Sequence, residues 1–307
     1  MVIRDIFLSC FFALTMSAAG AQNLIPYQNV IGTHGLTGPS MPFFDDDGNY
    51  YLFLRMIIPS TNTDLGNISA TVYGTTFFAL SKYTQNHQLL WTESYGGDST
   101  DFFGNVEMVD DGFIIVCRSN SPVSGTKTME GNSFFHLWVI KVDFDGNDVW
   151  QKTIVVDGNL LVPSAKKMTN GNILISTSAP FGISGDKTEE GFGNTDAWLI
   201  MIDQEGNILW DKTIGTEGWD ISFIVLGQLS SGNIILSTMS SENASGLKTD
   251  DSFGWEDLWL ICISELNGEI LWDKTVGGSS SEYVWGGIIF NDNIFQNVGS
   301  YSDISGL

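Results

Sequence analysis

The chain is poor in basic residues, in proline and in long apolar runs. It has 13 Lys and Arg against 36 Asp and Glu, which gives its 307 residues a formal net charge of −23. A charge of that sign repels nucleic acid and anionic membrane surfaces, so we expect neither as a partner. Beyond the N-terminus no stretch approaches the ~18 apolar residues of a membrane helix, and we expect no membrane insertion.

Cysteine and histidine are also scarce, which limits the sites that the chain could build. Beyond Cys10, the cysteines are Cys117 and Cys262, both in apolar runs. We expect them to be buried small hydrophobic side chains, not a disulfide or a metal pair. The histidines are scattered at His34, His87 and His136, and their spacing suggests no Ser-His-Asp triad and no metal cluster. We therefore assign no catalytic, cofactor-binding or metal-binding residue and predict no cofactor.

Residues 1–21 have the pattern of a secretory signal peptide. Arg4 supplies the positive start, residues 6–18 form a short apolar core, and Ala19-Gly20-Ala21 fits a cleavage site. The mature chain would begin near Gln22 and would be secreted, periplasmic or displayed on the cell surface. An acidic, solvated surface suits such an exported protein.

What the chain has in abundance is a repeat of about 60 residues. Its clearest copy, Asp196–Gly215, is an apolar run, a polar turn and a second apolar run that ends in Trp-Asp-Lys-Thr. The tryptophans of the second runs are Trp91, Trp150, Trp210 and Trp272, and a second marker, S-G-x-K-T, occupies residues 124–128, 184–188 and 245–249. Residues 305–307 match the start of that marker, so we expect the chain to be a truncated piece of a longer protein.

Each copy contains four strand signals and no helical period. In the third copy we expect strands at 160–167, 173–177, 197–202 and 208–213, joined by tight turns and one long polar loop. The third strand is apolar throughout, which indicates that both faces of its sheet are covered. Stacked copies would cover one another. We therefore predict an all-β chain that forms a β-propeller of four-stranded antiparallel blades.

The repeat also sets the predicted boundaries. The propeller would occupy residues 22–307, with blades at 33–97, 98–156, 157–216 and 217–278 and a partial blade at 279–307. Residues 25–32 resemble a fourth strand and could supply the outer strand that closes the ring. The first blade is the most divergent, with an enlarged loop at 57–75.

The third and fourth strands resemble the pyrroloquinoline-quinone-like (quinoprotein-type) β-propeller repeat, in which Asp, then Gly, then Trp follow in order. Asp203, Gly206 and Trp210 match it, as do Asp143, Gly146 and Trp150, while Ser264 takes the place of the aspartate before Gly268 and Trp272. The unit looks like the repeats of large exported bacterial propeller proteins, many of which carry C-terminal sorting domains. The resemblance implies the fold but no activity, because this repeat occurs in enzymes and in scaffolds. Quinone-dependent enzymes of this fold use calcium, an acidic base and adjacent cysteines, and this chain has no adjacent cysteines.

Tryptophans are the most conspicuous candidates for ligand contact. Those that repeat are expected to fill the space between blades: Trp138, Trp198 and Trp259 on third strands, and Trp150, Trp210 and Trp272 on fourth strands. Trp219, Trp255 and Trp285 fall outside the pattern and near loops. They are the better candidates for contact with a ligand.

Two motifs imitate binding loops. Residues 45–49 and 143–148 look like the start of a calcium loop, but an EF-hand counted from Asp143 would need glutamate where Ile154 stands. We interpret both as hairpin turns. Residues 182–188 suggest a phosphate loop, but Asp186 separates glycine from lysine and no helix follows.

These observations predict a monomeric, non-enzymatic scaffold that binds an unknown protein or glycan ligand or mediates contact at the cell surface. The long loops at 119–135, 178–195 and 240–256 would emerge on one side and carry recognition. The alternative is a secreted polysaccharide-active enzyme with its site at the central channel. There the first strands would present Glu107, Lys166, Lys167 and Gln228, a set that we do not expect to form a catalytic centre.

Overall fold

The computed structural model describes residues 36–37, 42–57, 71, 73–161, 163–220 and 223–300. The expected signal peptide, the expected closing strand at 25–32 and residues 301–307 lie outside the described residues. Every regular element in the described ranges is a β-strand. That part of the chain therefore contains no helix long and apolar enough to cross a membrane, and the predicted all-β class is confirmed.

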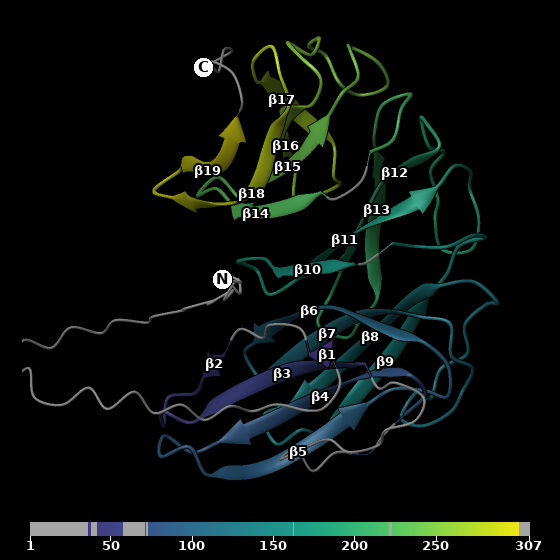
Figure 1. Cartoon of the computed structure of the whole chain (residues 1–307), viewed down its shortest axis with the longest axis vertical. Helices are drawn as coiled ribbons and strands as arrows, with labels where there is room; N and C mark the ends of the chain where they lie inside the picture. Colours follow the sequence, from purple (N-terminus) through teal and green to yellow (C-terminus); the bar gives the residue numbers. More distant parts are fainter. Residues whose placement is uncertain are drawn as a thin grey trace, which may run out of the picture. The chain divides into compact units, whose positions relative to one another are not determined.

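The strands form antiparallel sheets that follow one another in chain order (Figure 1). The first sheet contains β1 (Leu36–Thr37), β2 (Phe43–Phe44), β3 (Tyr50–Ile57), β4 (Thr76–Tyr83) and β5 (Leu89–Tyr95). The second contains β6 (Asp101–Val109), β7 (Gly112–Ser119), β8 (His136–Asp143) and β9 (Asp148–Ile154). The third contains β10 (Ser164–Lys167), β11 (Ile173–Pro180), β12 (Thr195–Ile202) and β13 (Ile208–Ile214). The fourth contains β14 (Ile224–Gln228), β15 (Ile234–Ser240), β16 (Asp257–Ile263) and β17 (Ile270–Val276), and β18 (Glu282–Phe290) pairs with β19 (Asn293–Ser300).

The first sheet departs from the predicted four strands, because two short strands share the edge of β3. β1 pairs with the end of β3, from Met56 to Ile57, and β2 pairs with its beginning, from Tyr50 to Tyr51. Pro42, directly before β2, has no N–H to donate to the ladder. Together the two short strands take the place of one interrupted first strand.

The third copy shows a second difference, at its first strand. We expected this strand to begin at Leu160, but β10 begins at Ser164, directly after Pro163. Leu160 is nevertheless fully buried, and its N–H donates to the carbonyl of Phe135 in the preceding sheet. The apolar pattern at Leu160 thus reflects burial between sheets and not membership of a strand.

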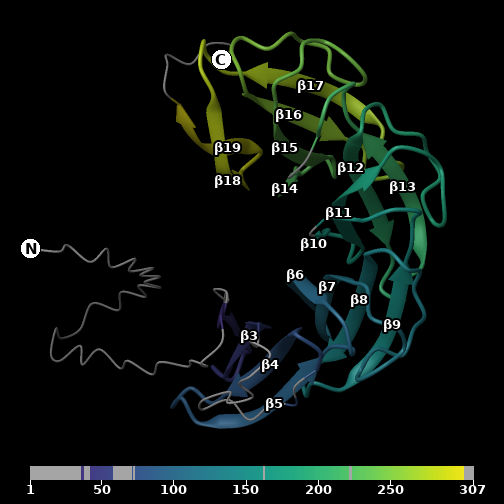
Figure 2. The same ribbon diagram turned by 45° about the vertical axis from the view of Figure 1, so that its right-hand side comes forward.

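Consecutive sheets stack face to face, which explains why the third strands are apolar on both sides. Tyr51 and Phe78 of the first sheet pack with Ile115 and Trp138 of the second in one hydrophobic cluster. The opposite face of the second sheet packs on the third, and the third packs on the fourth. Neighbouring first strands also meet: β6 contacts β10, β10 contacts β14 and β14 contacts β18, on the same side of the stack (Figure 2).

The motifs of the repeat meet within the third and fourth sheets. The indole N–H of Trp198, a fully buried third-strand residue, donates to Oδ2 of Asp211 at 2.9 Å. Asp211 also accepts the backbone N–H and the hydroxyl of Thr188, the threonine of the S-G-x-K-T loop. Asp273 does the same for Trp259 and Thr249 in the fourth sheet. One acidic side chain therefore ties the third strand, the fourth strand and the long loop together.

The fourth-strand tryptophans join one sheet to the next. Trp150 donates its indole N–H to the carbonyl of Gln204, in the turn of the following sheet, at 3.0 Å. A Cβ on Gly206 would lie 2.9 Å from the Trp150 ring, and the φ of +79° at Gly206 also favours glycine. The predicted packing of this tryptophan and of Trp210 is confirmed. Trp272 differs, because 41% of it is exposed.

Candidate binding cavities along the first strands

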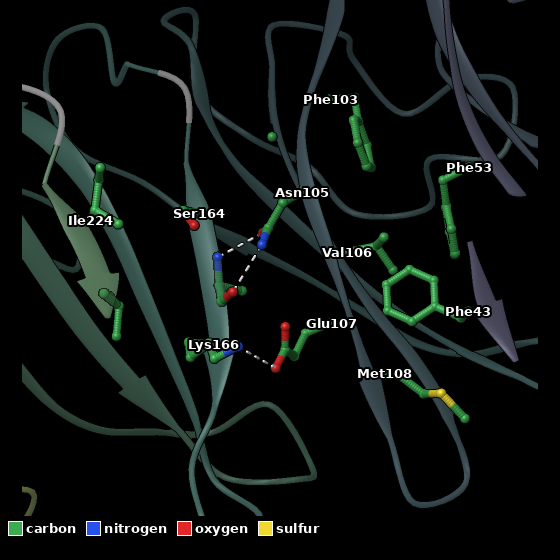
Figure 3. Close-up of a pocket in the computed structure, with 13 residues that line it drawn as sticks. Phe43, Phe53, Phe103, Asn105, Val106, Glu107, Met108, Ser164, Lys166 and Ile224 are labelled. Carbon is green, nitrogen blue, oxygen red and sulfur yellow. Dashed lines mark hydrogen bonds and ion pairs between the residues drawn. The ribbon is translucent and has the colours of Figure 1, made fainter. Parts of the chain in front are cut away.

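The first strands of the second, third and fourth sheets, together with Phe43 and Phe53 of the first sheet, line an open cavity of about 520 Å³ (Figure 3). Its apolar wall is formed by Phe43, Phe53, Phe103, Val106, Met108, Ile224 and Val225, and its polar wall by Asn105, Glu107, Ser164 and Lys166. A bulge between Phe103 and Asn105 shifts the register of β6 against β7. Gly104 lies at this bulge, where a Cβ would stand only 2.2 Å from the carbonyl oxygen of Pro163. Glycine therefore permits the close approach of β6 to β10.

The polar side chains of this wall are used to join the two sheets. Asn105 accepts the N–H of Ala165 at 2.7 Å and donates to its carbonyl at 2.9 Å, in the manner of a neighbouring strand. Oε1 of Glu107 accepts the backbone N–H of Lys167 at 3.1 Å and lies 3.7 Å from Nζ of Lys166. Both side chains hold β10 against β6, which is a structural task.

The residues that we placed at the central channel are therefore brought together only in part. Glu107 and Lys166 meet in the cavity, as Figure 3 shows. Lys167 instead extends to Asp110. Gln228 accepts the N–H of Thr169 at 2.8 Å and donates to the carbonyl of Gly232, so it also joins neighbouring sheets. These side chains are therefore suited to line a binding site, and they do not form a pair placed for proton transfer.

A second cavity, of about 550 Å³, contains an aromatic ring that the repeat does not explain. Trp219 lines it, together with Phe223, Ile224, Met239, Val284, Ser164, Thr238, Ser241 and Glu256. Of the Trp219 side chain and backbone, 68% is exposed. Trp255 is 76% exposed and does not line this cavity, and the side chain of Trp285 lies outside the described residues. Of the three tryptophans that the sequence suggests for ligand contact, the structure therefore places Trp219 in this cavity and Trp255 outside it.

The backbone that carries Trp219 is held in place on both sides. Trp219 forms an isolated parallel bridge with Thr195. The N–H of Asp220 donates to the carbonyl of Thr195 at 2.9 Å, and the N–H of Leu247 donates to that of Gly215 at 3.0 Å. The exposed ring therefore stands on a fixed backbone, which lowers the entropy cost of binding a ligand.

Both Trp219 and Glu256 interrupt the repeat. The backbone hydrogen bond from Asp220 to Thr195 recurs between the next two sheets, where the N–H of Glu282 donates to the carbonyl of Glu256. It also recurs between the preceding two, where Leu160 donates to Phe135. The residue equivalent to Trp219 is Asn159 in one of these copies and Ser281 in the other. The residues equivalent to Glu256 are Thr195 and Phe135. The fold requires neither side chain, yet the two meet in one cavity. Comparing the copies position by position could have found Glu256.

The motifs that imitate binding loops are turns, as predicted. Oδ1 of Asp143 accepts the N–H groups of Asp145 and Asn147, and Oδ2 accepts the Asn147 amide. Partial burial opposes the charged form, but these hydrogen bonds prevail and hold the pKa of Asp143 below its ordinary value. Asp45 is bound by Asn49 in the same way.

The lysine of the S-G-x-K-T loop is also structural. Lys187 is almost fully buried, and its ammonium donates to the carbonyls of Gly182 and Glu189 within the loop. Burial lowers the pKa of Lys187, and nearby acids such as Asp196 oppose that shift. The loop therefore folds around its own lysine, which leaves the ammonium no role as a phosphate ligand.

The remaining sulfur and imidazole groups lie apart. Cys117 and Cys262 are buried free thiols, as predicted. His87 contacts the hydroxyl of Tyr50 and His136 is buried against the carbonyl of Phe134, while His34 lies outside the described residues. Among the residues that the structure describes, no three His, Cys, Asp or Glu side chains gather as a metal site.

No protein-family model matches the chain, and a search of curated proteins finds none with a similar sequence.

Proposed function

We propose that this protein is an exported, non-enzymatic β-propeller scaffold that binds a saccharide in the Trp219 cavity. The propeller part of the proposal is supported by the four-stranded sheets, their face-to-face packing and the contacts between successive first strands. Export is supported by the signal-peptide pattern of residues 1–21. The net charge of −23 is compatible with both.

The observation that carries the ligand class is the presence of Trp219 and Glu256 in the wall of one cavity. A flat, exposed ring offers a face to the C–H groups of a sugar, and a carboxylate accepts hydrogen bonds from neighbouring hydroxyls. Ser241 and Thr238 add polar groups to the same wall. The size of the cavity, about 550 Å³, suits one or two sugar rings, within the usual range of small-molecule sites.

A glycan array probed with the full chain, followed by calorimetric titration of the best glycan, tests this proposal. Trp219→Ala is expected to weaken binding about tenfold, because an aromatic contact contributes ~1.5 kcal/mol. Glu256→Gln is expected to weaken it by a smaller factor. Trp255→Ala is the matched control, because it removes another largely exposed tryptophan that lies outside the cavity.

Three results would refute the proposal. No glycan bound, or equal losses for Trp219→Ala and Trp255→Ala, would remove the Trp219 cavity as the site. Turnover of a polysaccharide that depends on Glu107 would instead favour an enzyme with its site in the first-strand cavity.

A further inference from the structure

The two arginines that follow Arg4 come together in this strongly acidic chain. They are Arg55 and Arg118. Arg55 pairs with Phe78 on β4 and Arg118 with Leu137 on β8, which are equivalent positions of successive sheets. Their guanidinium carbons lie 5.4 Å and 4.5 Å from the centre of the Phe102 ring. Two like charges therefore share one aromatic side chain.

Among the described residues, no carboxylate forms an ion pair with either arginine. The ion pairs within the described ranges all involve lysine, and none involves an arginine. Arg118 donates from Nη1 to the carbonyl of Leu160 at 3.2 Å and lies 4.8 Å from the Phe135 ring centre. The Nε atoms of both arginines are buried without a hydrogen-bond partner. Burial lowers the pKa of Arg118, and the charge of Arg55 lowers it further.

The fold does not require arginine at this position. In the third and fourth sheets the equivalent residues are Ser178, which pairs with Ala197, and Met239, which pairs with Leu258. A half-buried positive charge without an ion-pair partner is costly, and a protein of net charge −23 has many acids that could have paired with it. An anion from outside the chain would remove that cost.

Arg118 also lines a third cavity, of about 280 Å³, whose wall is rich in hydroxyl groups. The wall contains Ser164, Ser176, Thr177 and Ser178, with Leu161 and Phe223. Thr177 donates its hydroxyl to the carbonyl of Leu161. The hydroxyls of Ser164 and Ser178 make no hydrogen bond within the described part of the chain, so both are available to a ligand. The residues that line the cavity thus include an arginine and two serines whose hydroxyls are not engaged.

We propose that this cavity binds an oxyanion, the carboxylate or phosphate group of a small molecule, with Arg118 as its principal donor. A guanidinium matches the two oxygens of such a group, and charge-assisted hydrogen bonds are about twice as strong as neutral ones. The negative net charge of the chain does not prevent binding, because 0.15 M salt screens exposed charges beyond ~8 Å. The site goes beyond the proposed function, and it would stand if the saccharide proposal failed.

The test is calorimetric titration of the full chain with inorganic phosphate, acetate and glucuronate, each at the same ionic strength. Saturable binding is expected, and Arg118→Gln should weaken it at least tenfold. Arg118→Lys should retain part of the affinity, because it keeps the charge and loses the two-pronged geometry. Lys274→Gln is the control, since it removes an equal charge from an exposed pair with Asp250.

The probes distinguish the sources of the oxyanion. Preference for phosphate assigns a phosphoryl ligand, and preference for acetate and glucuronate assigns a carboxylate. Absence of saturable binding of all three probes would overturn the site. So would equal affinities of the parent chain and the Arg118→Gln variant, provided that their unfolding midpoints agree.

Discussion

Replacement of Asp211 by alanine is the sharpest test of how the repeat holds together. Oδ2 of Asp211 accepts hydrogen bonds from the indole of Trp198 and the backbone of Thr188, both at 2.9 Å. Oδ1 accepts the Thr188 hydroxyl at 2.6 Å. Alanine removes all three acceptor contacts at once. It leaves the indole N–H of Trp198 in a fully buried position without a partner.

The size of the effect follows from these contacts. A hydrogen bond to a charged group contributes ~1.5–3 kcal/mol, and a buried donor left unpaired costs ~1–3 kcal/mol. The losses overlap, because the same N–H is counted in both, so we expect Asp211→Ala to lower the free energy of unfolding by about 3 kcal/mol. Asp211→Gln should cost less, since Gln151 already accepts the indole of Trp138 at the equivalent place.

Urea denaturation of the full chain at pH 7, followed by tryptophan fluorescence, measures this change. Glu205→Ala is the matched control, because it removes an exposed acid from the neighbouring turn whose side chain makes no hydrogen bond or ion pair with the described residues, and it should stay within ~0.5 kcal/mol. A loss below about 1 kcal/mol for Asp211→Ala would refute the reasoning. An equal loss in the control would do so as well.

Two further predictions concern backbone geometry and pH. In thermal melts, Gly206→Ala should lower the unfolding midpoint by several degrees more than Gly182→Ala. Both glycines have positive φ, but only Gly206 faces an aromatic ring, that of Trp150. Equal shifts for the two variants would contradict the inter-sheet contact. Burial raises the pKa of the Asp220 carboxyl despite hydrogen bonds from Thr216, so folding favours its neutral form. The stability that Asp220 contributes is therefore present below its pKa in the unfolded chain and is lost as the pH rises through its pKa in the folded chain. Asp220→Asn should therefore have its largest stability advantage over the parent chain near pH 7, and denaturation at pH 7 and pH 4 should show that advantage shrinking as pH falls.

Much of each sheet could be predicted from the sequence, because third and fourth strands carry their own local signals. The run at 197–202 is apolar throughout, and the strand found there begins only two residues earlier, at Thr195. The first strands were harder to predict. Their limits depend on contacts with the next sheet, such as the pairing of Asn105 with the backbone of Ala165, and no local pattern encodes such a contact.

The candidate sites show a similar division. Trp219 could be found from the sequence, because a tryptophan outside the repeat is conspicuous. Arg118 could have been found only by aligning the copies by strand register, which places it with Arg55, Ser178 and Met239. Ser164 carries no signal at all. It matters because three cavities adjoin there, and that depends on how β10 lies between its neighbours.

The stacking of sheets explains why these sites lie where they do. Along β7, the residues from Phe113 to Cys117 are fully buried between two sheets, so packing restricts them to apolar side chains of suitable volume. Arg118, the next residue, reaches the end of the packed region and faces a cavity. Arg118 is the next-to-last residue of β7, and Trp219 and Glu256 lie just outside strands. In a fold whose interior must repeat, side chains at the strand ends are free to differ between copies, and a binding site for one particular ligand can form only where they do.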